Sequence, residues 1–237
     1  MIILSSDYDG TLKTTHENLY INIAALRKFI KLGNIFILNT GRSYSSIKEQ
    51  IRKYHIPFNY LCCNDGAAIF NRHFGLVHAT YLSSEQKSHI KDLVACRERF
   101  RINHFYTAKE KLTIETECPI KIEVGKEPED SFQGFLEALK AEEMGLSAYP
   151  YQDSLYIKGN VSKSLAIHHV LERIEPSVNP QNVYTIGDEG NDLEMIMNHN
   201  GFRMEKSSPE LIEATSRTVP EAYVLIRRLI AKSKKKM

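Results

Sequence analysis

Two acidic clusters stand near opposite ends of the chain, and each directly follows a short apolar run. Asp7 and Asp9 belong to the first cluster, and Asp188 and Asp192 belong to the second. An apolar or β-branched run that ends at Gly or Asp is typical of a buried parallel strand that opens into a loop. Ligands of open α/β sheets bind outside the carboxyl ends of the strands, so two such strands side by side would bring the four carboxylates into one pocket. Carboxylates this close repel one another unless a hard cation lies between them, and Mg²⁺ is the usual choice where a phosphate also binds.

The spacing of Asp7 and Asp9 suits phosphoryl chemistry. Of two carboxylates at a strand end, the first can attack phosphorus and bind the metal ion, and the second can protonate the leaving oxygen. A calcium loop of the EF-hand type is the simpler alternative, but it needs Gly at its sixth position and Glu at its twelfth, where this chain has Leu12 and Asn18. With a strand before it and a second acidic cluster in the chain, the pair favours chemistry over an ordinary turn.

A further segment could bind a phosphate. Thr40, Gly41 and Arg42 end another strand-like run, where a hydroxyl can donate to a phosphoryl oxygen and the amides of the following helix point to the same place. The alternative is a plain connection from strand to helix, with Ser43 as the helix cap.

Lys163 lies in the first turn of a predicted helix at residues 162–174. A cation there opposes the helix dipole at a cost of about 0.3–1 kcal/mol. A solvated surface lysine is the default interpretation, but this position indicates an anionic partner, such as a phosphate or the Asp7 carboxylate. Asp188 and Asp192 could complete the cation site, one directly and one through water, although Asp192 could instead only cap the next helix.

The elements that must position these residues change in character along the chain. Strand-like and amphipathic helical segments alternate over the first 81 residues, and this alternation returns from residue 162 onward. Between these parts, a stretch of about 75 residues mixes helices with hairpin-like strands and interrupts the βαβ order. We therefore predict an α/β fold. Its doubly wound, Rossmann-like core comprises residues 1–81 and 158–237, and residues 82–157 form an inserted α+β cap.

Composition limits the classes of partner. The 237 residues are 42% hydrophobic and 25% charged, which is typical of a globular protein. The net charge of +2 includes four lysines in the last six residues, and such a tail is typical of a solvated chain end, so we expect no nucleic-acid partner. No apolar stretch approaches the ~20 residues of a membrane helix, and we expect a cytoplasmic protein without a membrane partner. Four cysteines without zinc-ligand spacing indicate free thiols.

Four segments, taken in order, resemble the motifs of the haloacid dehalogenase superfamily: DYDGTL, NTGR, NVSKSLAI and GDEGNDLEM. More narrowly, the chain looks like a Cof-type phosphatase with a type IIB cap, and the resemblance covers the whole chain. It departs from the family in two places. Asp65 stands where an Asn is usual, and Glu205 and Lys206 replace small residues after the fourth motif, which bears on the substrate more than on the reaction.

The resemblance implies a role for each residue of the motifs. Asp7 would be the nucleophile that forms an aspartyl-phosphate. Asp9 would be the general acid and then the base for water, with its backbone carbonyl on Mg²⁺. Thr40 and Asn191 would bind the phosphoryl group, and Lys163 would offset the charge of the nucleophile and the phosphate.

The resemblance also implies metal and substrate contacts. Asp188 would bind Mg²⁺ directly with Asp192 in support, and Arg42, next to Gly41, would face the cap and the substrate. The candidate substrate contacts from the cap stand near its return to the core, and they are Tyr151, Tyr156 and Lys158.

The function that the resemblance implies is a Mg²⁺-dependent phosphatase that hydrolyses a small phosphorylated metabolite, with sugar phosphates as the leading class. Two alternatives stay open. A phosphomutase of the phosphomannomutase type would transfer the phosphoryl group to a sugar rather than to water. A non-catalytic module would bind phosphate and Mg²⁺ without turnover, but the second carboxylate, Asp9, and the inserted cap argue against it.

Overall fold

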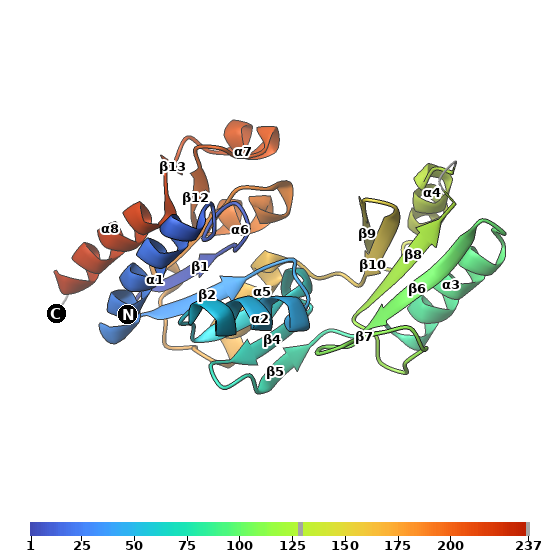
Figure 1. Ribbon diagram of the computed structural model, residues 1–237, viewed down its shortest axis with the longest axis horizontal. Helices are drawn as coiled ribbons and strands as arrows, with labels where there is room; N and C mark the ends of the chain where they lie inside the picture. Colours follow the sequence, from blue (N-terminus) through green and yellow to red (C-terminus); the bar gives the residue numbers. More distant parts are fainter. Residues whose placement is uncertain (128–129, 236–237) are drawn as a thin grey trace. The chain divides into compact units, whose positions relative to one another are not determined.

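The structure is a computed structural model that describes residues 1–127 and 130–235, and the chain divides into two compact units (Figure 1). One, here called the core unit, comprises Met1–Arg42, Ser46–Val77 and Ser162–Met237. The other, here called the cap unit, comprises Ser43–Ser45 and His78–Val161. Among the described residues, none of the helices is both long and apolar enough to cross a membrane.

The central sheet has eight strands in the order β13-β12-β11-β1-β2-β3-β4-β5. Neighbouring strands from β13 to β3 run parallel, and β4 pairs with β3 antiparallel. In chain order the strands are β1 (Ile3–Ser6), β2 (Ile35–Asn39), β3 (Tyr60–Cys63), β4 (Ala68–Asn71), β5 (Leu76–Ala79), β11 (Val183–Gly187), β12 (Asn200–Met204) and β13 (Thr218–Val219). β1 and β2 are buried along their whole length, as continuous apolar runs predict for parallel strands covered on both faces.

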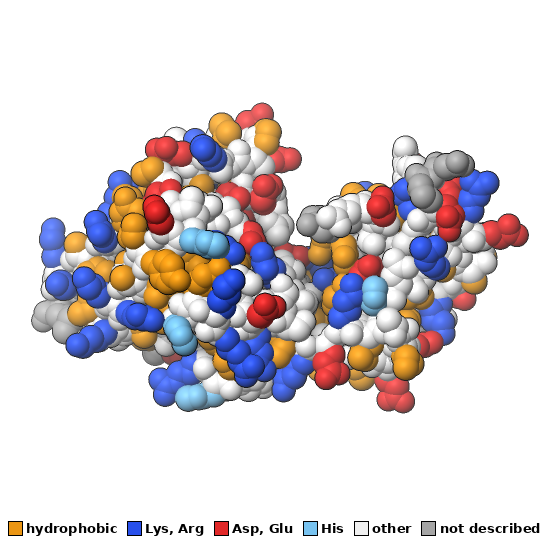
Figure 2. All heavy atoms as spheres, viewed as in Figure 1, with side chains coloured by type: hydrophobic (Ala, Val, Ile, Leu, Met, Phe, Trp, Pro, Cys, Tyr) orange, Lys and Arg blue, Asp and Glu red, His pale blue; other side chains and the backbone are white. Residues whose placement is uncertain are grey.

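Helices cover both faces of this sheet. Side chains of α5 (Lys163–Arg173), α6 (Leu193–Asn198) and α7 (Pro209–Ala214) pack with β1, β2 and β3 in one hydrophobic cluster. The other face is covered by α1 (His16–Lys31), α2 (Tyr44–Tyr54) and α8 (Ala222–Lys234) (Figure 1). The predicted α/β fold with a doubly wound core is therefore confirmed. On the face of the core unit seen in Figure 2, basic side chains are interspersed with acidic and apolar ones.

The strand register determines where the predicted site residues lie. Ser6 of β1 pairs with Ile186 of β11 on one side and with Leu38 of β2 on the other. The three strands therefore end at the same edge, and the residues that follow them enter one region. The same physical rule places ligands at the carboxyl ends of parallel strands in open α/β sheets.

In the part of the cap unit that the structure describes, two helices accompany an antiparallel sheet. Its strands lie in the order β7-β6-β8-β10-β9, and they are β6 (Phe100–Tyr106), β7 (Lys111–Leu112), β8 (Lys121–Lys126), β9 (Ser147–Tyr151) and β10 (Ser154–Lys158). A capping box between Ser83 and Gln86 begins α3 (Ser84–Ala95), and α4 (Gln133–Ala141) follows β8 in the chain. Both helices contribute buried apolar side chains to one cluster with β8 and β10, so this unit has its own hydrophobic core.

Candidate active site

Three carboxylates converge where β1 and β11 end. Asp7 follows β1, and its backbone N–H donates to the Ile186 carbonyl oxygen at 3.0 Å, which extends the pairing of the two strands. One oxygen each of Asp7, Asp188 and Asp192 lies within 4.8 Å of the other two, and all three residues are buried. Asp192 is held in place because its Oδ2 accepts from the backbone N–H of Asp188 at 3.0 Å and of Glu189 at 3.1 Å. This set of hard oxygen atoms could hold a divalent cation.

Burial and the closeness of the carboxylates raise the pKa of two residues in this cluster. Burial, together with the neighbouring Asp192 and Asp188 carboxylates, raises the pKa of Asp7 to about 8 even though Lys163 acts in the opposite direction. Burial and the Asp192 carboxylate raise the pKa of Asp188 to about 6, against a hydrogen bond from Thr11. The charged forms of these groups are thus disfavoured by their surroundings, and a bound cation would reverse that preference. The cluster therefore fits a metal ion.

Lys163 is the cation of this site. Its Nζ donates to Asp7 Oδ1 at 2.6 Å and to Asp192 Oδ1 at 2.7 Å, and the residue is only 1% exposed. Burial alone would lower its pKa, but the Asp7 and Asp192 carboxylates raise the pKa above the ordinary value. The anionic partner that its position in the first helical turn predicts is thus a pair of carboxylates.

The local sequence explains why α5 begins at this lysine. Ser162 caps the helix, since its hydroxyl accepts from the Leu165 N–H at 3.1 Å. Asn39, the last residue of β2, donates from its amide to the Lys163 carbonyl oxygen at 2.9 Å. The sequence did not single out Asn39, although its place in the NTGR segment put it next to predicted site residues.

Thr11 and Gly10 shape the pocket beside Asp188. Thr11 is fully buried, and its hydroxyl donates to Asp188 Oδ1 at 2.5 Å. Gly10 has a φ of +74°, and a Cβ atom at this position would lie 2.1 Å from Asp188 Oδ2. Both the backbone conformation and the close approach therefore require glycine. Thr11 was not predicted as a site residue, and its contact spans 177 residues of sequence, which no local pattern reveals.

Asp9 lies outside the trio of carboxylates, contrary to the expectation that four would share one pocket. Its side chain is 52% exposed and forms a bidentate pair with Arg42, with Nε to Oδ2 at 2.5 Å and Nη2 to Oδ1 at 2.7 Å. The hydrogen bond to Asp9 raises the pKa of the Arg42 guanidinium, which also lies over the Tyr8 ring. A residue two positions after Asp7 enters a turn, and the backbone there directs its side chain towards the end of β2 instead.

The remaining core residues predicted to bind phosphate come from two strand ends: Thr40 and Gly41 follow β2, and Asn191 follows β11. Thr40 is buried, and its hydroxyl accepts from the Arg42 N–H at 3.2 Å. Asn191 donates from its amide to Asp65 Oδ1 at 2.9 Å. A Cβ atom at Gly41 would lie 2.9 Å from that same Asp65 oxygen. Asp65 is thus part of the site, with a φ of +56° in the turn after β3.

The predicted cap residues belong to the other unit. Tyr156 and Lys158 lie on β10, and both point to the face of the cap sheet opposite its hydrophobic cluster. The side chain of Tyr151 lies outside the described residues.

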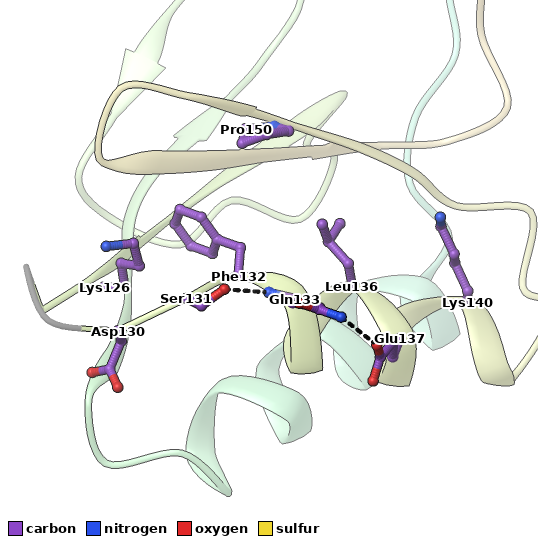
Figure 3. Close-up of a pocket in the computed structure, with 9 residues that line it drawn as sticks. All are labelled: Lys126, Asp130, Ser131, Phe132, Gln133, Leu136, Glu137, Lys140 and Pro150. Carbon is purple, nitrogen blue, oxygen red and sulfur yellow. Dashed lines mark hydrogen bonds between the residues drawn. The ribbon is translucent and has the colours of Figure 1, made fainter.

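A separate hollow of about 560 Å³ also lies in the cap unit (Figure 3). Phe132 and Leu136, from α4 and the turn before it, point into it, and Pro150 of β9 lies across from them (Figure 3). Its lining mixes both charges, with Lys126 and Asp130 at one end and Glu137 and Lys140 at the other (Figure 3). None of the residues predicted from the sequence to bind substrate lines it.

Comparison with known proteins places the chain in a family. A model of the haloacid dehalogenase-like hydrolases matches residues 4–147 and 103–223. A search of curated proteins finds no match.

Several solved structures share the fold over nearly the whole chain. A phosphatase of the haloalkanoate superfamily from Bacteroides thetaiotaomicron is 17% identical with a TM-score of 0.77, and the alignment covers 97% of this chain and 95% of that one. A HAD/COF-like hydrolase from Plasmodium vivax is 15% identical with a TM-score of 0.75, over 100% and 96% of the two chains. The sucrose-phosphatase of Synechocystis, solved with sucrose and phosphate, is 18% identical with a TM-score of 0.66, over 98% of each chain. At these identities the likeness concerns the fold.

Proposed function

Because the chain belongs to the haloacid dehalogenase-like hydrolases, we propose that it is a Mg²⁺-dependent phosphatase that hydrolyses a small phosphorylated metabolite through an aspartyl-phosphate. Membership confirms the resemblance to the haloacid dehalogenase superfamily and the prediction of an enzyme. The observation that carries the proposal is the buried contact of Lys163 with Asp7 beside two further carboxylates.

Asp7 is the proposed nucleophile. Lys163 holds its Oδ1, which orients the carboxylate and offsets the negative charge that builds up as a phosphoryl group approaches. Attack of the Asp7 carboxylate on phosphorus forms the acyl phosphate and breaks the bond between phosphorus and the leaving oxygen. Water then attacks the phosphorus, which releases phosphate and restores the Asp7 carboxylate.

Asp7, Asp188 and Asp192 are the proposed ligands of Mg²⁺, together with the backbone carbonyl of Asp9. The bound ion would supply positive charge to the carboxylates and to the phosphoryl oxygens. The hydrogen bonds that Asp192 accepts from two backbone amides, and the one that Asp188 accepts from Thr11, fix these carboxylates before any ion binds. Preordered ligands reduce the entropy that is lost on binding.

Asp9 is the proposed general acid and base. Its partly exposed carboxylate suits a group that must reach a leaving oxygen and later a water molecule. Because Arg42 holds both carboxylate oxygens, Asp9 has to loosen this pair before it can transfer a proton. Arg42 also suits contact with the substrate phosphate, since a guanidinium recognises phosphate in the same bidentate way.

Thr40, Gly41 and Asn191 are the proposed phosphate-binding groups. The Asp65 carboxylate accepts one N–H of the Asn191 amide and thereby sets the direction of that side chain. We also propose that the cap unit is the inserted cap of this family, with Tyr156 and Lys158 taking part in the choice of substrate. Sugar phosphates are the first class to test, since one structure of similar fold is a sucrose-phosphatase.

Hydrolysis of p-nitrophenyl phosphate with and without Mg²⁺ tests the proposal. We expect turnover that needs the metal and that falls by about 10³-fold or more in Asp7→Asn. Asp92→Asn, an equivalent change at an exposed position of α3, is the control and should keep full activity. Turnover that survives in Asp7→Asn would refute the aspartyl-phosphate route. Release of inorganic phosphate, rather than transfer to an added sugar, separates the phosphatase from the phosphomutase.

A further inference from the structure

Arg42 is a long side chain that stands next to the proposed general acid. Its guanidinium pairs with both carboxylate oxygens of Asp9, donates from Nη1 to Ser46 Oγ at 3.2 Å, and lies over the Tyr8 ring with Cζ 5.3 Å from the ring centre. All four residues belong to the core unit. The side chains of Asp9 and Arg42 are partly exposed, whereas Tyr8 is fully buried. The Tyr8 ring is therefore the best-fixed member of this group.

The Tyr8 ring is held by α2 and by its own turn. Its hydroxyl donates to Gln50 Oε1 at 3.3 Å, and the same oxygen accepts from Lys13 Nζ at 3.2 Å. The Lys13 N–H donates to the Tyr8 carbonyl oxygen at 2.8 Å, and the Gly10 N–H donates to the Lys13 carbonyl oxygen at 3.2 Å. These two bonds close the turn that also carries Asp9. A buried ring held by side chain and backbone offers a rigid surface, because close-packed interiors yield little.

An aromatic face suits a guanidinium that must stay in place when its anionic partner moves. Guanidinium groups lie on aromatic rings, and the ring attracts the positive charge within about 6 Å of its centre. This contact helps to offset the rotamer freedom that a long side chain loses when it is held in one position. Of the contacts of Arg42, the pair with Asp9 is the one that the proposed mechanism must open. The Tyr8 ring and Ser46 remain to hold the guanidinium while that pair is open.

The position of Arg42 bears on the proton that Asp9 transfers. As the bond between phosphorus and the leaving oxygen breaks, the proton passes from the Asp9 carboxyl group to that oxygen, and the carboxylate regains its negative charge. A guanidinium held beside Asp9 stabilises this charge as it develops. A general acid contributes most when the leaving oxygen is strongly basic, since a weakly basic leaving group departs without a proton. The benefit of a well-placed Arg42 should therefore depend on the leaving group.

We propose that Tyr8 is a positioning residue of the phosphatase, whose buried ring holds the Arg42 guanidinium in place and thereby supports proton transfer from Asp9 to the leaving oxygen. The ring carries this role rather than the hydroxyl, because the ring lies against the guanidinium and the hydroxyl bonds to Gln50. This inference rests on the proposed phosphatase function. It assigns a role to the residue between the two aspartates of the first acidic cluster.

Two aryl phosphates with different leaving groups test the inference. Phenyl phosphate releases a basic oxygen that needs a proton, whereas p-nitrophenyl phosphate releases a weakly basic one. The ratio of kcat/KM for phenyl phosphate to that for p-nitrophenyl phosphate should fall at least about tenfold in Tyr8→Leu and stay within about threefold of the wild type in Tyr8→Phe, which keeps the ring. A variant that only folds less well lowers both values and leaves their ratio unchanged. An unchanged ratio in Tyr8→Leu would overturn the inference, and so would an equal fall in Tyr8→Phe.

Tyr54→Leu is the matched control. Tyr54 is a buried tyrosine like Tyr8, and Lys13 Nζ lies over its ring as well, 5.4 Å from the centre. Among the residues that the structure describes, Arg42 lies over the ring of Tyr8 and not over that of Tyr54. The control should keep the ratio within about threefold of the wild type, and a fall as large as that in Tyr8→Leu would overturn the inference. Tyr8→Met, which fills more of the buried space, replaces Tyr8→Leu if that variant does not fold.

A measurement on Arg42 itself separates this inference from the proposed function. If the wild type hydrolyses neither ester, the phosphatase proposal fails, and NMR of the full chain decides whether Tyr8 holds Arg42. Arg42→Lys identifies the Nε–H signal of Arg42 by its loss. Because this N–H donates to Asp9 only while the guanidinium stays in place, its exchange with water should be at least about tenfold faster in Tyr8→Leu and unchanged in Tyr8→Phe and Tyr54→Leu. Equal exchange rates in the wild type and Tyr8→Leu would overturn the inference.

Discussion

In the core unit three buried carboxylates surround one lysine, whereas in the cap unit two largely buried lysines lie opposite each other and the nearest glutamate is paired with a third lysine. In the core unit the carboxylates outnumber the lysine that they surround, whereas in the cap unit the ammonium groups of the two lysines lie over tyrosine rings. Burial makes a cluster of like charges expensive, because water no longer screens their repulsion. The comparison supports the proposal that the cluster of the core unit binds a cation.

The largest effect should come from the lysine at the centre of the core cluster. Lys163→Met leaves Asp7 and Asp192 without their buried partner, so we expect a loss of about 3–5 kcal/mol in the free energy of unfolding. Turnover should fall by about 10²–10³-fold in the protein that remains folded. Urea titration and p-nitrophenyl phosphate hydrolysis measure the two effects. Lys109→Met, at an exposed position of the cap unit, should change neither the free energy of unfolding nor turnover. A similar loss in that variant would show that the effect is not specific to the buried lysine of the core unit.

Substitution of two glycines, one in each unit, compares how tightly the backbone is packed there. Gly10→Ala places a methyl group against the Asp188 carboxylate at a positive φ, so we expect about 1–3 kcal/mol of destabilisation and strongly reduced turnover. Gly134→Ala in α4 meets no atom within 4 Å, and it should stabilise the protein by about 0.4–1 kcal/mol. Thermal unfolding of both variants checks this. A stable, active Gly10→Ala protein would contradict the close packing of the core site.

Addition of Mg²⁺ tests whether the carboxylate cluster of the core unit binds a cation. Because a ligand that binds only the folded state stabilises it, Mg²⁺ at a hundred times its dissociation constant should add about 2.7 kcal/mol to the free energy of unfolding. Chelation by EDTA should remove this gain. Asp188→Asn takes one ligand from the cluster and should weaken the response, whereas Glu123→Gln in the cap unit should leave it unchanged. A response that is equal in both variants would place the ion elsewhere.

A further expected effect is a pH dependence that belongs to the cap unit. The pKa of Glu123 falls from its ordinary 4.5 to about 2 in the folded protein, so the carboxylate stabilises the fold above about pH 4.5 and this contribution is lost as the pH falls towards 2. Glu123→Gln should lower stability at pH 7 by about 1–3 kcal/mol and lose less on acidification than the wild type. Urea titrations at pH 7 and pH 3 compare the two proteins. An unchanged acid dependence in the variant would show that Glu123 is not the responsible group.

The fold was readable from the sequence because the signals involved are local. Apolar runs such as Ile35–Leu38 mark buried strands, and the spacing of Leu19, Ile23 and Leu26 marks the buried face of a helix. The interrupted βαβ order predicted the inserted unit, and a family match over most of the chain confirmed the resemblance drawn from four short motifs.

The site was readable only in part. Neighbouring parallel strands predicted that Asp7 and Asp188 would meet, and they do. The direction of Asp9 was not predictable, because the turn after β1 sends its side chain to Arg42. The contact of Thr11 with Asp188 and that of Asp65 with Asn191 also escaped prediction, since both join segments more than a hundred residues apart.

By itself, the sequence determined which groups are available for chemistry and at which strand ends they stand, because residue type and periodicity follow directly from the chain. The tertiary structure alone decided which of these groups meet. Strand register brings Asp7 beside Asp188, and the start of α5 places Lys163 between Asp7 and Asp192. The alternation of β8 and β10 sets Lys121 opposite Lys158. Distances between side chains depend on strand pairing and helix docking, and both result from the packing of the whole chain.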